Sequence, residues 1–237
     1  MSVFVIGDLH LSLGTDKPMD VFRGWENYVD RLKENWNSVV KDEDTVVIPG
    51  DISWAMKLED TRTDFGFINN ELNGNKIILK GNHDYWWATA GKMNKFLADC
   101  GFDRIKILNN NAYLADGICV VGTRGWINDG TDAFDAKVLS REEGRLRMSV
   151  QEGLKLGGEM IAFIHYPPLY GGEKNEYILR VIKEYGIKRC YYGHVHGRQS
   201  HAKAFIGEHE GTSYRMISAD YIGFMPELIE QNINGNY

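Results

Sequence analysis

Five short motifs in this chain contain residue types that bind metal ions or move protons. They are GDLH at 7–10, GD at 50–51, GNHD at 81–84, a single histidine at 165, and GHVHG at 193–197. Their carboxylate, carboxamide and imidazole groups suit borderline divalent ions such as Mn, Fe or Zn better than ions that prefer thiolates, and none of the motifs contains cysteine. Together they supply enough ligands for two adjacent metal ions.

Each motif follows a short apolar run that predicts a buried β-strand. The runs are VFVI, TVVIP, KIILK, MIAFI and KRCYY. Runs of this length are typical of strands, and in an open α/β sheet the residues just past the strand C-termini converge on one edge, where ligands bind. Ligands that are far apart in the sequence are therefore expected to be neighbours at that edge.

Taken singly, most of these motifs have an ordinary structural alternative. Asp8 and His10 could clasp one ion, or they could be a turn-forming aspartate and a surface histidine. Asp51 alone could be a turn or helix-cap residue. GHVHG is the most specific motif, because its glycines let backbone and metal approach closely. The occurrence of all five motifs, each at a predicted strand end, favours a metal site.

The order of the motifs resembles the calcineurin-like metallophosphoesterase superfamily, whose pattern is D-x-H, G-D, G-N-H-[D/E], H and G-H-x-H. The resemblance covers residues 7–197, and no motif position is substituted. It implies that one metal is held by Asp8, His10, Asp51 and His196, and the other by Asp51, Asn82, His165 and His194, with Asp51 bridging. It also implies that His83 is a catalytic imidazole and that Asp84 is hydrogen-bonded to it, setting its tautomer and charge.

The elements between the motifs predict how these residues are positioned. Apolar residues recur at helical spacing over 20–40, and further helices are predicted over 58–72, 87–99, 132–155 and 174–185. IKIL, AYLA and ICVVG suggest antiparallel strands, and the tail over 201–229 suggests strands again. The expected fold is α/β (α+β), a four-layer sandwich of two packed mixed β-sheets flanked by helices, with the dinuclear metal site at the strand C-terminal ends.

Aromatic and basic residues near the motifs are candidates for substrate contacts. Trp54 and Tyr85 lie beside the motifs, and with other aromatics they could form a stacking wall for a flat group. Packing that braces the loops is the alternative that we favour for the set. Arg198 directly follows GHVHG and is the best candidate to hold a phosphate, ahead of Arg124, Arg141 and Arg145; an exposed, solvated role is the alternative for each.

Length and composition limit the class of protein. With 237 residues and 43% hydrophobic content, we expect one domain over 1–237. A net charge of −6 argues against a general binder of nucleic acid or membrane surfaces. Three cysteines without paired spacing suit a reducing compartment, and neither a leader nor an apolar run long enough to span a bilayer is seen. We expect a cytoplasmic protein.

The sequence therefore predicts a hydrolase that acts on phosphoric ester bonds. Two divalent or trivalent transition metal ions (Mn, Fe or Zn) would activate water for attack on a small phosphate mono- or diester. One alternative is a non-catalytic, metal-binding scaffold for protein interactions on the same fold. The other is a nuclease, which the acidic balance and the lack of a basic tract weigh against. The complete ligand set, with His83, favours the enzyme.

Overall fold

Two large β-sheets form the centre of the protein. The computed structural model describes residues 1–126 and 133–231. The first sheet has the order β13 (Glu227–Ile229), β1 (Val3–Val5), β2 (Thr45–Pro49), β3 (Asn75–Leu79) and β4 (Ile105–Ile107). The second has the order β11 (Gly207–His209), β12 (Thr212–Met216), β10 (Arg189–Tyr192), β7 (Glu159–Ile164), β6 (Ile118–Thr123) and β5 (Tyr113–Ala115). A small hairpin pairs β8 (Leu169–Tyr170) with β9 (Glu173–Lys174).

Both sheets are mixed, with parallel strands in their centres. Strands β1 to β4 are parallel to one another, as are β6, β7, β10 and β12, whereas β13, β5 and β11 pair antiparallel at the outside. The two sets of strand C-termini meet, because the Gly7 amide after β1 donates to the carbonyl of Ile217 after β12 at 2.8 Å. The loops that follow both sets of parallel strands therefore share one edge.

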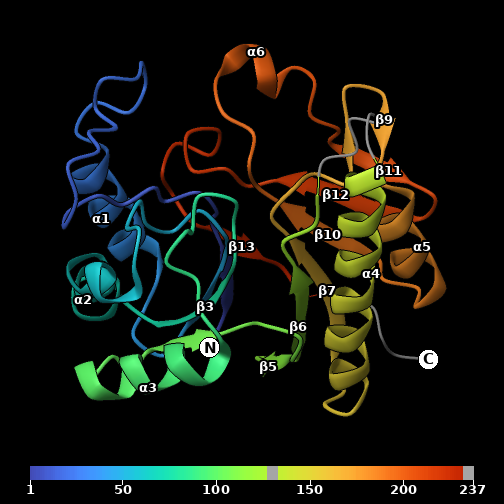
Figure 1. Ribbon diagram of the computed structural model, residues 1–237, viewed down its shortest axis with the longest axis horizontal. Helices are drawn as coiled ribbons and strands as arrows, with labels where there is room; N and C mark the ends of the chain where they lie inside the picture. The colour runs from blue at the N-terminus through green and yellow to red at the C-terminus, as the bar shows by residue number, and fades with distance from the viewer. Residues whose placement is uncertain (127–132, 232–237) are drawn as a thin grey trace.

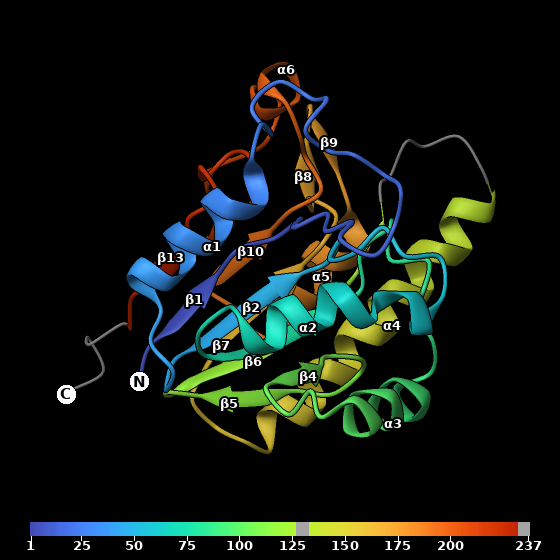
Figure 2. The same cartoon turned by 90° about the vertical axis from the view of Figure 1, so that its left-hand side faces the viewer.

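The sheets pack face to face, and helices cover their outer faces (Figure 1). In β2, Val47 packs between the sheets while Val46 and Ile48 face the helices, as the two-residue period of a strand requires. Helices α1 (Tyr28–Val39), α2 (Arg62–Asn70) and α3 (Ala90–Cys100) lie on the first sheet, and α4 (Ala133–Leu154) and α5 (Glu176–Glu184) lie on the second (Figures 1 and 2). The predicted four-layer α/β sandwich is confirmed.

The first predicted helix is wrong over its first two turns. The α1 helix begins at Tyr28 rather than at residue 20. Gly24 and Asn27 have positive φ angles of 93° and 50°, which a right-handed helix does not allow, and the Asn27 amide donates to Asp20 Oδ1 at 2.8 Å. Local turns therefore override the apolar spacing, and the 12–27 segment runs as an irregular loop.

Other boundaries differ for similarly local reasons. The predicted 58–72 helix is a short 3₁₀ helix, η1 (Leu58–Thr61), followed by α2. The next helix begins at Ala90 rather than at residue 87, because Thr89 caps it by accepting from the Lys92 amide at 3.4 Å. The helices predicted over 132–155 and 174–185 are found as the shorter α4 and α5; residue 132 lies outside the described residues, and Lys174 belongs to β9.

The predicted strand pairings are right in part. IKIL forms β4, which pairs parallel to β3, so the antiparallel pairing predicted for it is wrong. AYLA and ICVVG form the antiparallel β5–β6 hairpin, whose two turn residues have the positive φ angles of a type I′ turn. The tail contains the predicted hairpin, β11–β12, but also a short helix, α6 (Arg198–His201). Within the described ranges, no helix is long and apolar enough to cross a membrane.

Candidate metal centre

The five motifs meet at the shared edge of the two sheets. GDLH, GD and GNHD follow β1, β2 and β3 of the first sheet, and His165 and GHVHG follow β7 and β10 of the second. The seven residues predicted as metal ligands form two compact groups there. The prediction that distant strand ends would bring these side chains together is confirmed.

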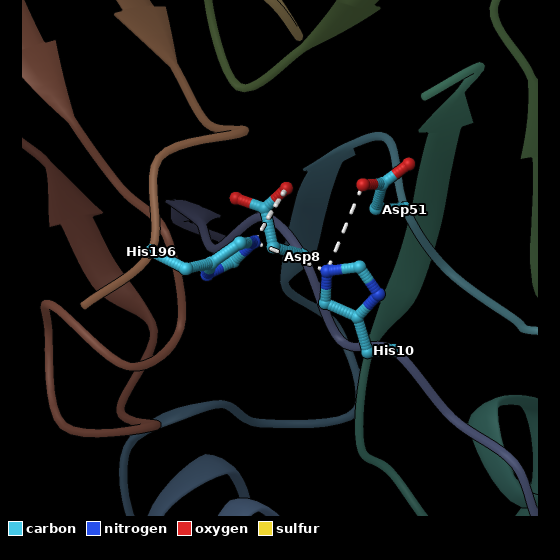
Figure 3. Close-up of side chains that lie close together, drawn as sticks. All are labelled: Asp8, His10, Asp51 and His196. Atoms are coloured by element: carbon cyan, nitrogen blue, oxygen red, sulfur yellow. Dashed lines mark hydrogen bonds and ion pairs between the residues drawn. The ribbon is translucent and has the colours of Figure 1, made fainter. Parts of the chain in front are cut away.

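The first group joins both sheets and consists of Asp8, His10, Asp51 and His196. One ligand atom from each lies within 4.8 Å of the others. His10 Nε2 is 3.1 Å from His196 Nε2 and 3.6 Å from Asp51 Oδ2, and the four side chains point toward one another (Figure 3). Metal–ligand bonds of about 2.0–2.2 Å place neighbouring ligand atoms at about this spacing. The group therefore fits one metal ion.

The second group shares Asp51 with the first. Asp51, His165 and His194 also offer ligand atoms within 4.8 Å of one another. Asn82 completes the group, because its Oδ1 lies 2.7 Å from His165 Nε2 and 2.8 Å from His194 Nδ1. Asp51 Oδ2 is buried and has no hydrogen-bond partner among the described residues. The Asp51 carboxylate thus lies between the two sets of ligands, and its Oδ2 is available to bind a cation.

The backbone of the motif loops is held in an unusual conformation. Asp8, His10, Asp51 and His194 have positive φ angles of 61°, 46°, 50° and 74°, a region that non-glycine residues rarely adopt and that clusters at functional sites. A Cβ atom at Gly81 would lie 2.1 Å from Asp51 Oδ1, and one at Gly193 would lie 2.4 Å from Asp8 Oδ2. Glycine is required at both positions because the carboxylates pack directly against its backbone.

The electrostatics of the two groups suit cations. Burial raises the pKa of Asp8 to about 7 and that of Asp51 to about 6. Burial also lowers the pKa of His165 to about 3 and that of His10 well below its usual range, with neighbouring histidines adding to both shifts. His10 and His165 are therefore neutral, with lone pairs free to bind a metal, and bound cations would favour the ionised carboxylates. The donor set fits two metal ions.

Hydrogen bonds behind the ligands fix which ring nitrogen faces the centre. His165 Nδ1 lies 3.0 Å from the Pro49 carbonyl, and His196 Nδ1 lies 2.9 Å from Asp220 Oδ1, so each ring turns its Nε2 inward. Burial alone would lower the pKa of His196, but Asp220 and Asp8 raise it overall. Asp220 also accepts from the Gly197 amide at 2.9 Å.

The sequence analysis missed Asp220, which lies outside the five motifs. The signal that could have found it is its position just after β12, another parallel strand of the second sheet. His201 lies beside it, with Nε2 3.3 Å from Asp220 Oδ2.

His83 lies at the metal centre, but it is not oriented by Asp84. Its amide donates to Asp51 Oδ1 at 2.7 Å, its ring lies 4.3 Å from that of Trp54, and its Nδ1 has no partner among the described residues. Burial lowers the pKa of His83, while the charge of Asp51 opposes this. The imidazolium predicted from an Asp84 contact is therefore not favoured here.

Asp84 positions the motif loops instead. It is fully buried and accepts from five donors, namely the amides of Asp51, Ile52, Ser53 and Gly81 and the indole of Trp86. The hydrogen bond predicted between Asp84 and the His83 ring is thus absent from the described hydrogen bonds, because both carboxylate oxygens bind the GD and GNHD loops together. Burial, helped by the charge of Asp51, raises the pKa of Asp84 to about 7.

A cavity of about 480 Å³ opens onto the first ligand group. His10, His83 and His196 line it on one side, and the 12–27 loop contributes Lys17 and Arg23. Other lining residues include Met19, Phe22, Trp25 and Trp54. Lys17 Nζ lies 4.1 Å from the centre of the Trp54 ring. We call this the aromatic cavity.

The residues predicted to bind substrate differ in where they lie. Trp54 lines the aromatic cavity. Tyr85 is exposed, with its ring 6.1 Å from that of His83, and Arg198 is exposed at the start of α6, one residue after Gly197, which lines the cavity. Lys17 and Arg23 were missed because part of their loop was predicted to be helical. Trp86 is buried against Phe65 and braces the GNHD loop, as the packing alternative predicted.

Comparison with known proteins supports the same interpretation. The family model for calcineurin-like phosphoesterases matches residues 1–198. The chain belongs to this family. A comparison with curated proteins returns no match. This calcineurin-like phosphoesterase is similar to TT1561 of Thermus thermophilus, with 13% identity, a TM-score of 0.59 and coverage of 96% of this chain and 97% of that chain.

A second solved structure shares the same fold. It is a protein of unknown function, AQ665, from Aquifex aeolicus, with 15% identity, a TM-score of 0.51 and coverage of 96% of this chain and 95% of that chain. Similarity at this identity shows the fold alone. Family membership and the two ligand groups together indicate a metal-dependent phosphoesterase.

Proposed function

We propose that this calcineurin-like phosphoesterase hydrolyses a small phosphate ester at a dinuclear metal centre. The observation that carries the proposal is the pair of ligand groups that share Asp51, each with its ligand atoms within 4.8 Å. Asp8, His10, Asp51 and His196 would hold one ion, and Asp51, Asn82, His165 and His194 the other. When bound, two such ions would lower the pKa of a shared water and neutralise phosphoryl oxygens. The donor set favours Mn, Fe or Zn.

His83 is the proposed proton donor to the ester. It lines the aromatic cavity beside the ligands, and its Nδ1 has no hydrogen-bond partner among the described residues. Because its pKa is lowered, we expect a neutral ring near pH 7. A neutral imidazole still carries one N–H, which can donate to the phosphoryl or leaving-group oxygen. Asp84 acts only through the loops, by holding Asp51 and Gly81 in place.

The aromatic cavity favours an ester with a flat or apolar group. Trp54 and Trp25 offer ring faces and edges, and Tyr85 lies nearby at the surface. Lys17 and Arg23 add positive charge to the cavity, which would attract an anionic ester. Arg198 stays a prediction as a phosphate contact at the rim. We also retain a cytoplasmic location and a single domain over 1–237 as predictions.

Two rival functions make different predictions. A non-catalytic scaffold has no need of His83, whose ring lines the cavity without a hydrogen-bond partner for its Nδ1. A nuclease usually meets its polyanionic substrate with a broad basic face, whereas this chain carries a net charge of −6. Both observations favour a phosphoesterase for a small substrate over either rival.

The test is hydrolysis by protein of defined metal content. Purified protein is stripped with a chelator, reloaded separately with Mn, Fe or Zn, and assayed on an aryl phosphate and a bis-aryl phosphate. We expect turnover to return as two equivalents of metal bind, and the ratio of the two rates to assign the monoester or diester preference. Two tightly bound metals without turnover on any ester would contradict the proposal and favour the scaffold. Cleavage of oligonucleotides alone would favour the nuclease.

A further inference from the structure

A second, smaller cavity lies at the same edge of the sheets and is lined by three cationic side chains. It sits between the ends of β3, β4 and β6 and the helix α4, and its volume is about 70 Å³. Lys80 comes from the end of β3, Arg124 from the end of β6 and Arg145 from α4, and the other lining residues include Trp87, Asn109 and Asn110. It shares no lining residue with the aromatic cavity. We call it the basic cavity.

Two buried carboxylates among the described residues partly offset these cations, namely Asp84, whose charge acts on Lys80, and Glu142. Glu142 is fully buried, accepts from Thr123 Oγ1 and Arg145 at 2.6 Å each, and lies 3.6 Å from the Arg124 guanidinium. Lys80 lies in no ion pair within the described ranges, and Arg124 Nε is buried without a hydrogen-bond partner there. Positive charge therefore exceeds negative charge in the basic cavity, and donors are left unsatisfied. Both conditions favour an anion.

The size of the basic cavity limits the class of anion. Because one water needs about 10–15 Å³ of such space, a cavity of about 70 Å³ accommodates roughly five to seven waters. A tetrahedral oxyanion is more compact than five separate waters, because its heavy atoms are covalently bonded, so it fits within this space. Guanidinium groups match the oxygens of phosphate in a planar, bidentate arrangement, and lysine adds a point charge. A phosphate-sized oxyanion thus matches both the volume and the donors.

The basic cavity is a direct neighbour of the metal centre. Lys80 lies two residues before the proposed ligand Asn82. The carbonyl of Thr123 accepts from the amide of His165, and the carbonyl of Arg124 accepts from the amide of Tyr166, at 3.3 and 2.9 Å. The two sites therefore both use the end of β3, and β6 of the basic cavity pairs directly with β7 of the metal centre. An anion in the basic cavity would lie beside the second ligand group, away from the aromatic cavity.

We propose that Lys80, Arg124 and Arg145 form a binding site for a phosphate-sized oxyanion. The oxyanion would be either a second phosphoryl group of the substrate or a free inorganic phosphate that modulates the neighbouring centre. Binding itself does not depend on the proposed hydrolysis, so it can be tested without metals or turnover.

The test is calorimetric titration of inorganic phosphate into the full chain after chelator treatment, which removes the competing metal centre. We expect Lys80→Gln and Arg145→Gln to weaken phosphate binding about tenfold or more, as the loss of a charged hydrogen bond predicts. Arg141→Gln is the matched control, because Arg141 is exposed on the same helix one turn earlier and should bind phosphate like the unmodified chain.

Folding of each variant is checked by its melting temperature. Arg145→Gln removes a partner of buried Glu142 and could destabilise the chain, whereas Lys80→Gln breaks no ion pair of the described residues. Lys80→Gln therefore decides the test if Arg145→Gln unfolds. Absence of phosphate binding to the stripped chain, or equal binding by Lys80→Gln and Arg141→Gln, would overturn the proposal.

The source of the oxyanion is then assigned with the metal-loaded enzyme. If it is part of the substrate, Lys80→Gln should raise KM for esters that carry a second phosphoryl group and leave KM for simple aryl phosphates unchanged. If it is a free effector, added phosphate should change the turnover of a simple aryl phosphate in the unmodified enzyme but not in Lys80→Gln, beyond the product inhibition that both share. This assignment rests on the proposed function, whereas the binding measurement does not.

Discussion

The metal centre and the basic cavity lie at one edge of the sheets but are unbalanced in opposite directions. At the metal centre, buried carboxylates lie among histidines that include the neutral His10 and His165. In the basic cavity, three cations are offset by two carboxylates, Glu142 and Asp84. The backbone positions the ligands of the metal centre: four ligand residues have positive φ angles, and glycines pack against the carboxylates. The cations of the basic cavity are carried instead by long, flexible side chains.

The two sites should therefore differ in their sensitivity to substitution. Ligands on a strained, tightly packed backbone are held in place before any ion binds. Neighbouring groups therefore cannot shift to compensate when one ligand atom is changed. Lysine and arginine side chains can move to share a charge, so single changes in the basic cavity should weaken binding gradually. We therefore expect the largest effects at the metal centre.

Asp51→Asn should have the largest effect of any single substitution. The change weakens the one carboxylate that both ligand groups share, and we expect at least about a 10³-fold loss of hydrolysis, or ~4 kcal/mol. Elemental analysis should show loss of metal. Asp44→Asn is the control, since Asp44 is also buried but binds the amides of Ser2 and Lys41 away from the metal centre. Two metals and near-native turnover in Asp51→Asn would contradict the bridging role.

His83→Ala should separate chemistry from metal binding. The ring lines the aromatic cavity, while only its backbone amide contacts Asp51. We expect a rate loss of about 10²- to 10⁴-fold, the range for a positioned proton donor, with both metals retained. His209→Ala, at the surface hairpin, should leave the rate unchanged. Loss of metal from His83→Ala, measured in the same way, would make His83 a ligand instead.

The sequence predicted the metal centre better than its surroundings, for physical reasons. Each ligand directly follows a buried strand, and parallel strands fix where such residues lie, so Asp8 and His194 could be placed together from sequence alone. Arg23 could not be placed, because the turns around Gly24 and Asn27 override helical spacing. The parallel pairing of β4 with β3 was missed for another reason, since strand pairing depends on partners that are distant in the sequence.

The roles of Asp84 and Asp220 also could not be predicted from the sequence motifs. Asp84 was assigned to the His83 ring because the family resemblance implied it, but five donors on other residues occupy its oxygens. Asp220 reaches His196 from a separate strand end and belongs to no motif. A motif predicts which side chains meet at a sheet edge, whereas the hydrogen bonds behind them depend on loops with no pattern of their own.

Asp220→Asn should have an intermediate effect. Its carboxylate holds His196 Nδ1 at 2.9 Å and the Gly197 amide at the same distance, which orients one ligand of the first group. Loss of such a partner typically lowers metal affinity about 10- to 100-fold. Competition with a chromophoric chelator would measure it, and only one of the two metals should weaken. His201→Ala, which removes the other neighbour of Asp220, is the control and should leave metal affinity nearly unchanged.

Lys76→Met should have the smallest effect. It tests whether a buried, unpaired lysine can occur in this fold without belonging to an anion-binding site. Lys76, on the same strand as Lys80, is fully buried, and its Nζ donates to the Leu72 carbonyl. Burial, with repulsion from Arg104, lowers the pKa of Lys76 to about 7. Since it lines neither ligand cavity, its charge is only a cost to folding, and we expect methionine to add about 1 kcal/mol, or roughly 2–4 °C in Tm.

The pH dependence of that gain identifies its cause. Between pH values of about 7 and 10.4, the unfolded chain holds a proton on Lys76 that the folded chain lacks, so the unmodified protein gains stability as the pH rises through this window. The advantage of Lys76→Met should therefore be largest at or below about pH 7 and shrink toward about pH 10. Lys106→Met, an exposed lysine on β4, should show no such trend. If the gain does not depend on pH, it arises from packing, and Lys76 says nothing about unpaired charge at the basic cavity.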